Sequence, residues 1–263
     1  MTITVTLEQH LRERRDGGRK LLMPYLSGGV TADWTDHLLA IIANGADGVE
    51  VGIPFSDPVM DGPTIQAASE LALARGTTPG SVLADLRAVA TEVDVPLIAM
   101  TYANIAFRTG ARRFAAEAVD AGVGGVILPD VPIEELGAWE PAAQGVGLQT
   151  VLLASPVNSE ARLDEICRRA EGFVYGVNLL GVTGVRAEVG ERASTLARKL
   201  KAVTDMPVVM GFGVSNGEQA RALTTIADGV VVGSAVVQRV VDGATPAELG
   251  RFIAELRSAL DAA

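Results

Sequence analysis

The chain has 263 residues, 48% of them hydrophobic and 4% aromatic, and a formal net charge of −10 at pH 7. This negative charge argues against nucleic acids and anionic membranes as partners. The single cysteine, Cys167, excludes a disulfide framework and a cysteine metal cluster, and its helical, apolar surroundings predict a core thiol. No secretion signal and no apolar run of roughly 18 residues is found, so a soluble, cytoplasmic protein is expected.

Short apolar runs bounded by glycine or proline predict eight strands. They lie near residues 21–26, 47–53, 96–102, 125–129, 149–154, 172–177, 206–211 and 228–232. Amphipathic stretches between them predict helices, so the whole chain, residues 1–263, is expected to form a single (β/α)₈ TIM barrel. An open doubly wound sheet is the alternative. An extra N-terminal helix before residue 20 is expected to cap the barrel floor.

Two gaps between predicted elements are long, one at residues 54–63 after the second strand and one at residues 177–192 after the sixth. Loops at the carboxyl ends of barrel strands carry the chemistry of such enzymes. We therefore expect functional residues in both gaps.

The second strand carries a carboxylate on its inward face. A period of two places Gly48, Glu50 and Gly52 on one face and two valines on the other. The valines suit the helices, so Glu50 is predicted in the lumen, where the glycines leave space for a ligand and lost hydration raises its pKa, as suits a proton donor. The alternative is a structural glutamate paired with an arginine.

Asp61 precedes Gly62 and Pro63 and is either a functional carboxylate or the N-terminal cap of the next helix. Asp57 and Asp130 occupy similar positions after strands, with structural roles as the alternative.

Two glycine pairs follow the last two strands. Gly211 and Gly213 follow the seventh, and Gly233 with Ser234 opens a short helical stretch after the eighth. Barrels often bind phosphate at these places through backbone N–H groups and a helix N-terminus. The dinucleotide pattern GxGxxG fails because Asn216 replaces the third glycine. The alternative is that these are turn glycines only.

The lack of lysine and histidine at strand ends limits the kinds of reaction that the chain could catalyse. None of the three lysines follows a strand, which argues against a Schiff-base mechanism. Both histidines lie in early helical segments, which argues against a histidine-ligated metal and against a Ser-His-Asp triad. What remains is carboxylate acid–base chemistry on a phosphorylated substrate. Tyr102 and Tyr175 are possible auxiliaries, with core packing as the alternative.

Several of these motifs resemble the tryptophan synthase α subunit. The most specific is EVGIPFSDPVMDGPTIQ at residues 50–66. It is followed by MTYAN at 100–104, LPDVP at 128–132, GVTG at 181–184, GFG at 211–213 and GSA at 233–235. The resemblance extends from about residue 8 to 257. The chain departs from the common pattern at residues 27–31 and 178–180.

The resemblance implies retro-aldol cleavage of indole-3-glycerol phosphate to indole and glyceraldehyde 3-phosphate in tryptophan biosynthesis. It implies that Glu50 protonates the indole ring and then accepts the substrate hydroxyl proton. Asp61 would accept a hydrogen bond from the indole N–H, and Tyr175 would lie beside the two carboxylates. Thr183 would lie on a mobile loop that closes on Asp61.

The resemblance also implies three sets of binding residues. The substrate-binding set is Tyr25, Tyr102, Ile127, Pro129, Leu153, Thr183 and Phe212. The phosphate-binding set is Gly184, Gly213, Gly233 and Ser234. The partner-binding set is Asp57, Pro58, Asn104, Asp130 and Pro132.

The implied partner is a β subunit carrying pyridoxal phosphate, in an αββα heterotetramer, with no metal or cofactor in this chain. Two alternatives are a free-standing lyase of the same chemistry and a non-catalytic barrel that activates a partner. Indole-glycerol phosphate synthase, a related barrel, would need a catalytic lysine on a strand, which this sequence lacks.

Overall fold

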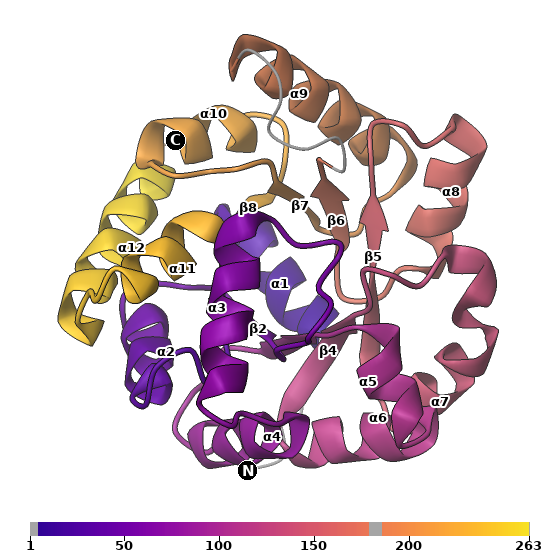
Figure 1. Ribbon diagram of the computed structural model, residues 1–263. Helices are drawn as coiled ribbons and strands as arrows, with labels where there is room; N and C mark the ends of the chain where they lie inside the picture. The colour runs from indigo at the N-terminus through magenta and orange to yellow at the C-terminus, as the bar shows by residue number, and fades with distance from the viewer. Residues whose placement is uncertain (1–4, 179–185, 263) are drawn as a thin grey trace.

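A computed structural model describes residues 5–178 and 186–262, and over this part of the chain eight parallel strands form a closed barrel (Figure 1). Each strand pairs with the next along the chain, and β8 closes the ring against β1. The strands are β1 Leu21–Ser27, β2 Val49–Gly52, β3 Leu97–Met100, β4 Val123–Ile127, β5 Gln149–Ala154, β6 Val174–Val177, β7 Val208–Gly211 and β8 Gly229–Val232. Every strand overlaps its predicted run, so the predicted barrel is confirmed and the open sheet is wrong.

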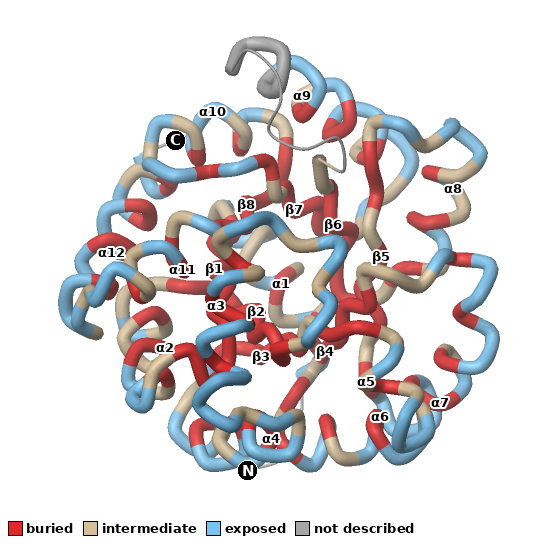
Figure 2. The backbone as a smooth tube through the Cα atoms, viewed as in Figure 1, coloured by how far each residue is buried: buried red, intermediate tan, exposed pale blue. Residues whose placement is uncertain are grey.

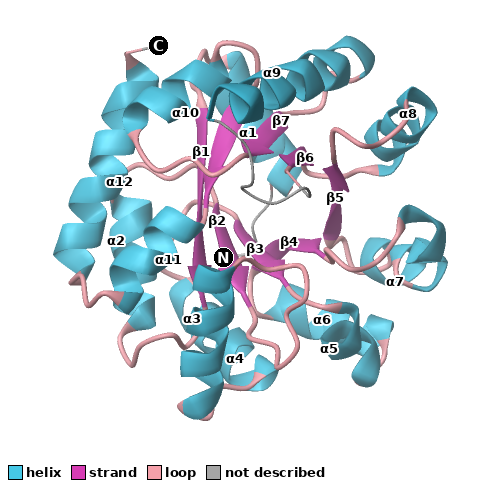
Figure 3. Cartoon of the chain, turned by 45° about the horizontal axis from the view of Figure 1, so that its top comes forward, coloured by secondary structure: helices cyan, strands magenta, loops and turns pink. Residues whose placement is uncertain are grey.

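Helices surround the strands, as Figure 3 shows. They are α1 Leu7–Asp16, α2 Trp34–Ala43, α3 Pro63–Ala74, α4 Pro79–Val89, α5 Ala103–Arg108, α6 Ala111–Asp120, the 3₁₀ helix η1 Ile133–Ala138, α7 Glu140–Gln144, α8 Glu160–Arg169, α9 Arg186–Val203, α10 Gly217–Thr224, α11 Ser234–Val241 and α12 Pro246–Asp261. None of the helices described is long and apolar enough to cross a membrane.

The core has two parts, one between strands and helices and one inside the barrel, and Figure 2 shows the buried strands at its centre. Val49 and Val51 belong to the outer part, as the strand period predicts. Cys167 is also buried in the outer part, and burial raises the pKa of its thiol to about 11, which confirms a core thiol.

Helix α1 closes the floor of the barrel. Thr6 caps it through a reciprocal capping box with Gln9, which fixes where the helix begins. Leu7 and Leu11 are buried in the inner part of the core, in the same cluster as Ile98 and Val151 from the barrel strands. The predicted role of the extra N-terminal helix is confirmed.

The two long gaps predicted between strands and helices agree with the structure to different degrees. The first matches the structure, because β2 ends at Gly52 and α3 begins at Pro63. The second was placed at residues 177–192, but α9 already begins at Arg186. The stretch 186–189 consists of arginine, alanine, glutamate and valine, and the first three favour helix, so the predicted loop was too long.

Candidate active site

A cavity of about 430 Å³ lies where the carboxyl ends of β1–β3 and β6–β8 meet α3 and α11. Its lining is Tyr25, Glu50, Asp61, Thr64, Ile65, Met100, Tyr175, Gly211, Gly213, Val214, Ser215, Val231, Gly233, Ser234, Ala235 and Gln238. The three predicted catalytic residues and three of the predicted phosphate-binding residues therefore share one cavity. Their sequence positions span 50 to 234, so the barrel brings them together.

Glu50 reaches this cavity as a fully buried carboxyl group. Neither of its carboxyl oxygens has a hydrogen-bond partner, and burial raises its pKa to about 8. The structural alternative, pairing with an arginine, is not found here. Asp47, in the same segment, is the acid that pairs with arginine. Its carboxylate contacts Arg257 at 3.1 Å and Arg19 at 2.5 Å. Glu50 is thus kept neutral near pH 7 and free to transfer a proton.

The glycines beside Glu50 have a different role from the predicted one. A Cβ atom on Gly52 would lie 1.8 Å from the hydroxyl oxygen of Tyr25, and one on Gly48 would lie 2.8 Å from the terminal methyl of Met23. The expectation that these glycines leave space for a ligand was wrong. They make room for side chains of the neighbouring strand β1. This strand pairs with β2 in parallel, with Tyr25 aligned with Glu50.

Asp61 also lines the cavity, from the loop before α3. The cap of α3 is Gly62, with no side-chain hydrogen bond, so the capping alternative for Asp61 is excluded. Its carboxylate instead accepts a hydrogen bond of 3.0 Å from the Tyr102 hydroxyl. Burial raises the pKa of Asp61 to about 6, and the Tyr102 hydrogen bond partly opposes this rise. Near neutral pH the group is largely ionised.

Tyr175 and Tyr25 complete the buried part of the cavity wall. Tyr175 packs closely against the backbone of Gly211, where a Cβ atom would lie 2.6 Å from its ring. Burial, and then the charge of Glu50, raise the pKa of Tyr175 well above its ordinary value. Burial likewise raises the pKa of Tyr25. Both hydroxyls therefore stay protonated and can donate hydrogen bonds.

The part of the cavity formed by Gly213 and the start of α11 has the features of an anion site. Gly233 is the N-cap of α11 and makes no side-chain capping bond, so the first N–H groups of the helix, at Ser234 and Ala235, lack intrahelical partners. Gly213 has a φ of 71°, which favours glycine. Asn216, which breaks the dinucleotide pattern, caps α10 through a 3.0 Å bond from the Gln219 N–H.

The other predicted substrate residues that the structure describes lie outside the cavity lining. Tyr102 contacts Asp61, whereas Ile127 is buried in the inner core with Leu153 packed against it, and Phe212 is buried in the outer core. Pro129 is half-buried after β4. None of these five lines the cavity, and their contact with substrate stays a prediction. Thr183 and Gly184 lie outside the described residues.

Some cavity residues were missed from the sequence. Met100 and Val231 lie two residues beyond inward-facing positions of β3 and β8, so the strand period could have found them. Thr64, Ser215 and Gln238 lie on helices or loops, where no local pattern marks them.

The predicted partner face is exposed beside the cavity. Val59 and Met60 in the loop before Asp61 are 78% and 42% exposed, unusual for large apolar side chains. Asp57 accepts a 2.7 Å hydrogen bond from Ser56, and Asp130 accepts one of 2.9 Å from the N–H of Ala103. Asn104 and Pro132 are exposed and Pro58 is half-buried. The structure thus exposes most of this face.

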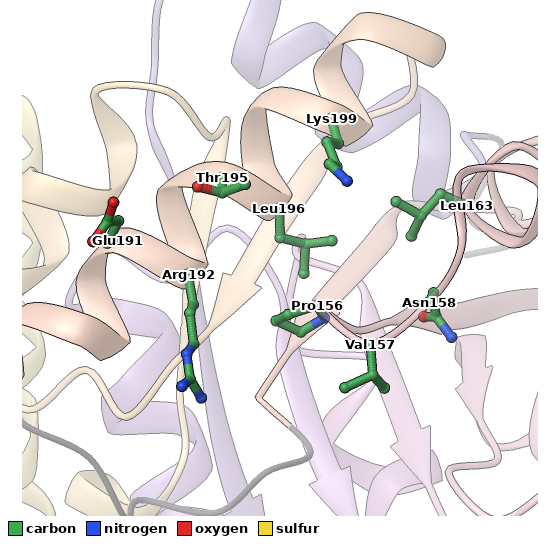
Figure 4. Close-up of a pocket in the computed structure, with 9 residues that line it drawn as sticks. All are labelled: Pro156, Val157, Asn158, Leu163, Glu191, Arg192, Thr195, Leu196 and Lys199. Carbon is green, nitrogen blue, oxygen red and sulfur yellow. The ribbon is translucent and has the colours of Figure 1, made fainter.

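A separate hollow of about 530 Å³ lies between α8 and α9 (Figure 4). Its lining includes Pro156, Leu196 and Lys199, and none of the predicted site residues. Within the part of the chain that the structure describes, no group of three or more histidine, cysteine or acidic side chains could hold a metal ion.

Comparison with known proteins decides the family. The model of the family "Tryptophan synthase alpha chain" matches residues 11–257. The chain belongs to this family. A tryptophan synthase alpha chain of Synechococcus is 42% identical, over 99% of this chain and 97% of its own length. That of Streptomyces avermitilis is 43% identical, over 90% and 86%. The solved tryptophan synthase α subunit of Legionella pneumophila is 32% identical and superposes with a TM-score of 0.89, covering 100% of both chains.

Membership of the tryptophan synthase alpha chain family confirms the resemblance seen in the sequence motifs. It also confirms the predicted function, an enzyme with lyase activity that cleaves indole-3-glycerol phosphate in tryptophan biosynthesis. The family implies a β-subunit partner.

Proposed function

We propose that this chain cleaves indole-3-glycerol phosphate with Glu50 as the proton donor and acceptor and Asp61 as the electrostatic partner of the indole ring. The observation that carries this assignment is the state of Glu50. It is a buried carboxyl group without a hydrogen-bond partner, with a pKa raised to about 8, in the same cavity as Asp61 and the first turn of α11. A neutral carboxylic acid at pH 7 is the form that can donate a proton.

The proposed reaction begins with transfer of the Glu50 proton to C3 of the indole ring. The ring then carries a positive charge and can accept the electron pair of the bond between C3 and the glycerol chain. Glu50, now a carboxylate, removes the proton of the adjacent chain hydroxyl. That bond breaks, the hydroxyl carbon becomes the aldehyde of glyceraldehyde 3-phosphate, and indole is restored. Glu50 ends protonated, so the step needs no outside acid or base.

Asp61 has a complementary part in this proposal. Its pKa of about 6 leaves it mostly ionised at pH 7, and its carboxylate would accept the indole N–H and stabilise the ring charge. The two carboxyl groups thus differ in protonation because Glu50 is more deeply buried and Asp61 accepts a hydrogen bond from Tyr102. Tyr175, protonated and beside Gly211, supplies a further donor to the substrate.

Backbone groups would bind the phosphate end of the substrate. The free N–H groups at the start of α11 and the backbone at Gly213 suit a dianion despite the net charge of −10. The predicted contributions of Gly184 and Thr183 belong to the same proposal. Because the chemistry uses only carboxyl groups and the indole ring itself, the proposal assigns no cofactor to this chain.

The exposed loop at residues 57–60, with Asn104, Asp130 and Pro132, is proposed as the face that binds a β subunit carrying pyridoxal phosphate, in an αββα heterotetramer. The exposed Val59 and Met60 support this assignment, because they give the loop an apolar surface next to the cavity. The proposed location is the cytoplasm, as suits an enzyme of amino-acid biosynthesis. A free-standing lyase remains the second candidate.

Release of indole from indole-3-glycerol phosphate, with and without a β subunit, tests the proposal. Glu50→Gln keeps the shape of the side chain but removes proton transfer, so kcat should fall at least about a hundredfold with KM little changed. Glu160→Gln is the matched control, since Glu160 is an exposed glutamate outside the cavity. Activity of Glu50→Gln within about tenfold of the unaltered chain would overturn the mechanism. A β subunit that neither binds nor activates the chain would favour the free-standing lyase.

A further inference from the structure

A hydrogen bond joins the two helices that carry the ends of the proposed site. The Thr64 hydroxyl, in the first turn of α3, donates to the side-chain carbonyl oxygen of Gln238 on α11 at 3.2 Å. Thr64 lies three residues after Asp61, and Gln238 lies one turn after Ser234. Both side chains line the cavity, and α3 and α11 are in contact (Figure 1). The bond thus joins the helix that follows Asp61 to the helix that begins at Ser234, beside the cavity.

A second hydrogen bond fixes the direction of the first. The amide nitrogen of Gln238 donates to the carboxylate of Asp242 at 2.9 Å, one turn further along α11. With its nitrogen directed to Asp242, Gln238 presents its carbonyl oxygen to Thr64. A carbonyl oxygen can only accept, so in this structure the Thr64 hydroxyl donates its single proton to Gln238.

This arrangement makes the Thr64 oxygen an acceptor toward the cavity. A phosphate dianion offers only acceptors at its oxygens and gains nothing from such a group. The hydroxyl groups of a glycerol chain are donors and match it. In the proposed mode of binding, the three-carbon chain must run between Asp61 and the start of α11.

We propose that Thr64 binds a hydroxyl group of the substrate's glycerol chain as a hydrogen-bond acceptor, and that Gln238 is a positioning residue that holds it in that role. This inference rests on the proposed function, because it takes the indole end at Asp61 and the phosphate end at Ser234. It assigns to the cavity wall the recognition of the hydroxylated chain, and so the discrimination against substrate analogues that lack hydroxyls.

Two ligands separate this role from general support of the fold. Indole-3-glycerol phosphate carries the chain hydroxyls, and 3-(indol-3-yl)propyl phosphate has the same ring and phosphate without them. The KM for the first and the inhibition constant for the second are measured in one indole-release assay. The ratio of the two constants reports the hydroxyl contacts alone, because changes in ring or phosphate binding affect both.

Thr64→Val, which removes the oxygen at nearly constant shape, should raise the KM for indole-3-glycerol phosphate by about three- to tenfold, the factor of one neutral hydrogen bond. It should leave the inhibition constant of the propyl phosphate unchanged. Thr64→Ser, which keeps the hydroxyl, should keep the ratio of the two constants near that of the unaltered chain. Gln238→Met should give a smaller rise in the KM for indole-3-glycerol phosphate, because the Thr64 hydroxyl remains but Gln238 no longer accepts its proton.

Ser215→Ala is the matched control, since Ser215 also lines the cavity and its hydroxyl also donates to a glutamine, Gln219, at 3.0 Å. It lies two residues from Gly213, at the phosphate end, and should leave the ratio unchanged. An equal change in both constants for Thr64→Val, or a Thr64→Ser variant as weak as Thr64→Val, would overturn the inference. Failure of the proposed mechanism is distinguished by Glu50→Gln, which would then release indole within about tenfold of the unaltered chain.

Discussion

The Tyr102 hydroxyl bridges two groups of the loop after β2, donating to the Asp61 carboxylate at 3.0 Å and accepting from the Met60 N–H at 3.1 Å. Its ring stacks on Phe55 with centroids 5.0 Å apart and planes at 27°. Tyr102 follows β3, so the loops of two neighbouring strands hold the carboxylate proposed to face the indole N–H. The same loop exposes Met60 on the proposed partner face.

Tyr102→Phe keeps the ring stack but removes the donor to Asp61. Since that hydrogen bond lowers the pKa of Asp61, its loss should raise the pKa above about 6. Asp61 must be ionised to act, so the acidic limb of the kcat/KM profile should move to higher pH. Activity should fall several-fold more at pH 6 than at pH 8. A profile that drops by the same factor at every pH would show that Tyr102 acts through substrate contact or packing alone.

The phosphate end can be tested at Gly233, where the structure supplies a clean control. A Cβ atom there would meet only the Tyr25 Cβ at 3.7 Å, an ordinary contact, and its φ of −97° is negative, so no left-handed backbone calls for glycine. Gly233→Ala should therefore bind substrate nearly normally. Gly233→Asp places a like charge beside the phosphate and should raise the KM for indole-3-glycerol phosphate strongly. A near-normal KM for the aspartate variant would move the phosphate site elsewhere.

Gly213→Asp should weaken substrate binding as well, but it needs a different control. The φ of 71° at Gly213 strains most side chains, so part of any loss comes from the backbone. Gly213→Asn has nearly the shape of the aspartate variant without its charge. A larger KM for the aspartate than for the asparagine variant therefore isolates the repulsion of the phosphate.

Asp57→Ala tests the proposed partner face. The side chain is exposed and its carboxylate accepts a hydrogen bond only from the neighbouring Ser56 among the contacts described. Activation by a β subunit should fall more than the lyase rate of the isolated chain. Titrating the chain with β subunit while following indole release measures both quantities. An equal loss in both would assign Asp57 to the local structure of its loop.

The sequence predicts those features that depend on local periodicity. The alternation of Val49, Glu50 and Val51 placed the glutamate inside the barrel, and recurrent apolar runs placed the eight strands. Local context after the strands singled out Asp61 and Gly233, and the family motifs then gave them roles; the barrel brings both to the same cavity. These signals lie within a few residues of the groups that they identify.

Contacts across the barrel could not be predicted in this way. Gly52 appeared to leave space for a ligand, but strand β1 packs beside it and the Tyr25 side chain fills that space. The Asp61 carboxylate looked like a possible helix cap, and only the position of the next strand's loop reveals Tyr102 as its donor. Thr64 and Gln238 are 174 residues apart, so nothing in either segment indicates their bond.

The raised pKa of Glu50 also makes a prediction for stability. In the folded chain the pKa is about 8, and in the unfolded chain it should return to about 4.5. Between these values the folded chain holds a proton that the unfolded chain releases, so the free energy of unfolding should fall as pH rises from about 5 to 8. The slope from this one group is at most about 1.4 kcal/mol per pH unit.

Glu50→Gln isolates that slope, because glutamine does not titrate. Other groups, including Asp61 and His10, change their protonation in both proteins and cancel in the difference. The free energy of unfolding of Glu50→Gln minus that of the unaltered chain should therefore increase steadily from pH 5 to 8. Urea unfolding at pH 5, 6.5 and 8 measures it, with Glu160→Gln as the exposed control. A difference that stays constant with pH would mean that Glu50 ionises in the folded chain as easily as in water, and the neutral proton donor of the proposed mechanism would be lost with it.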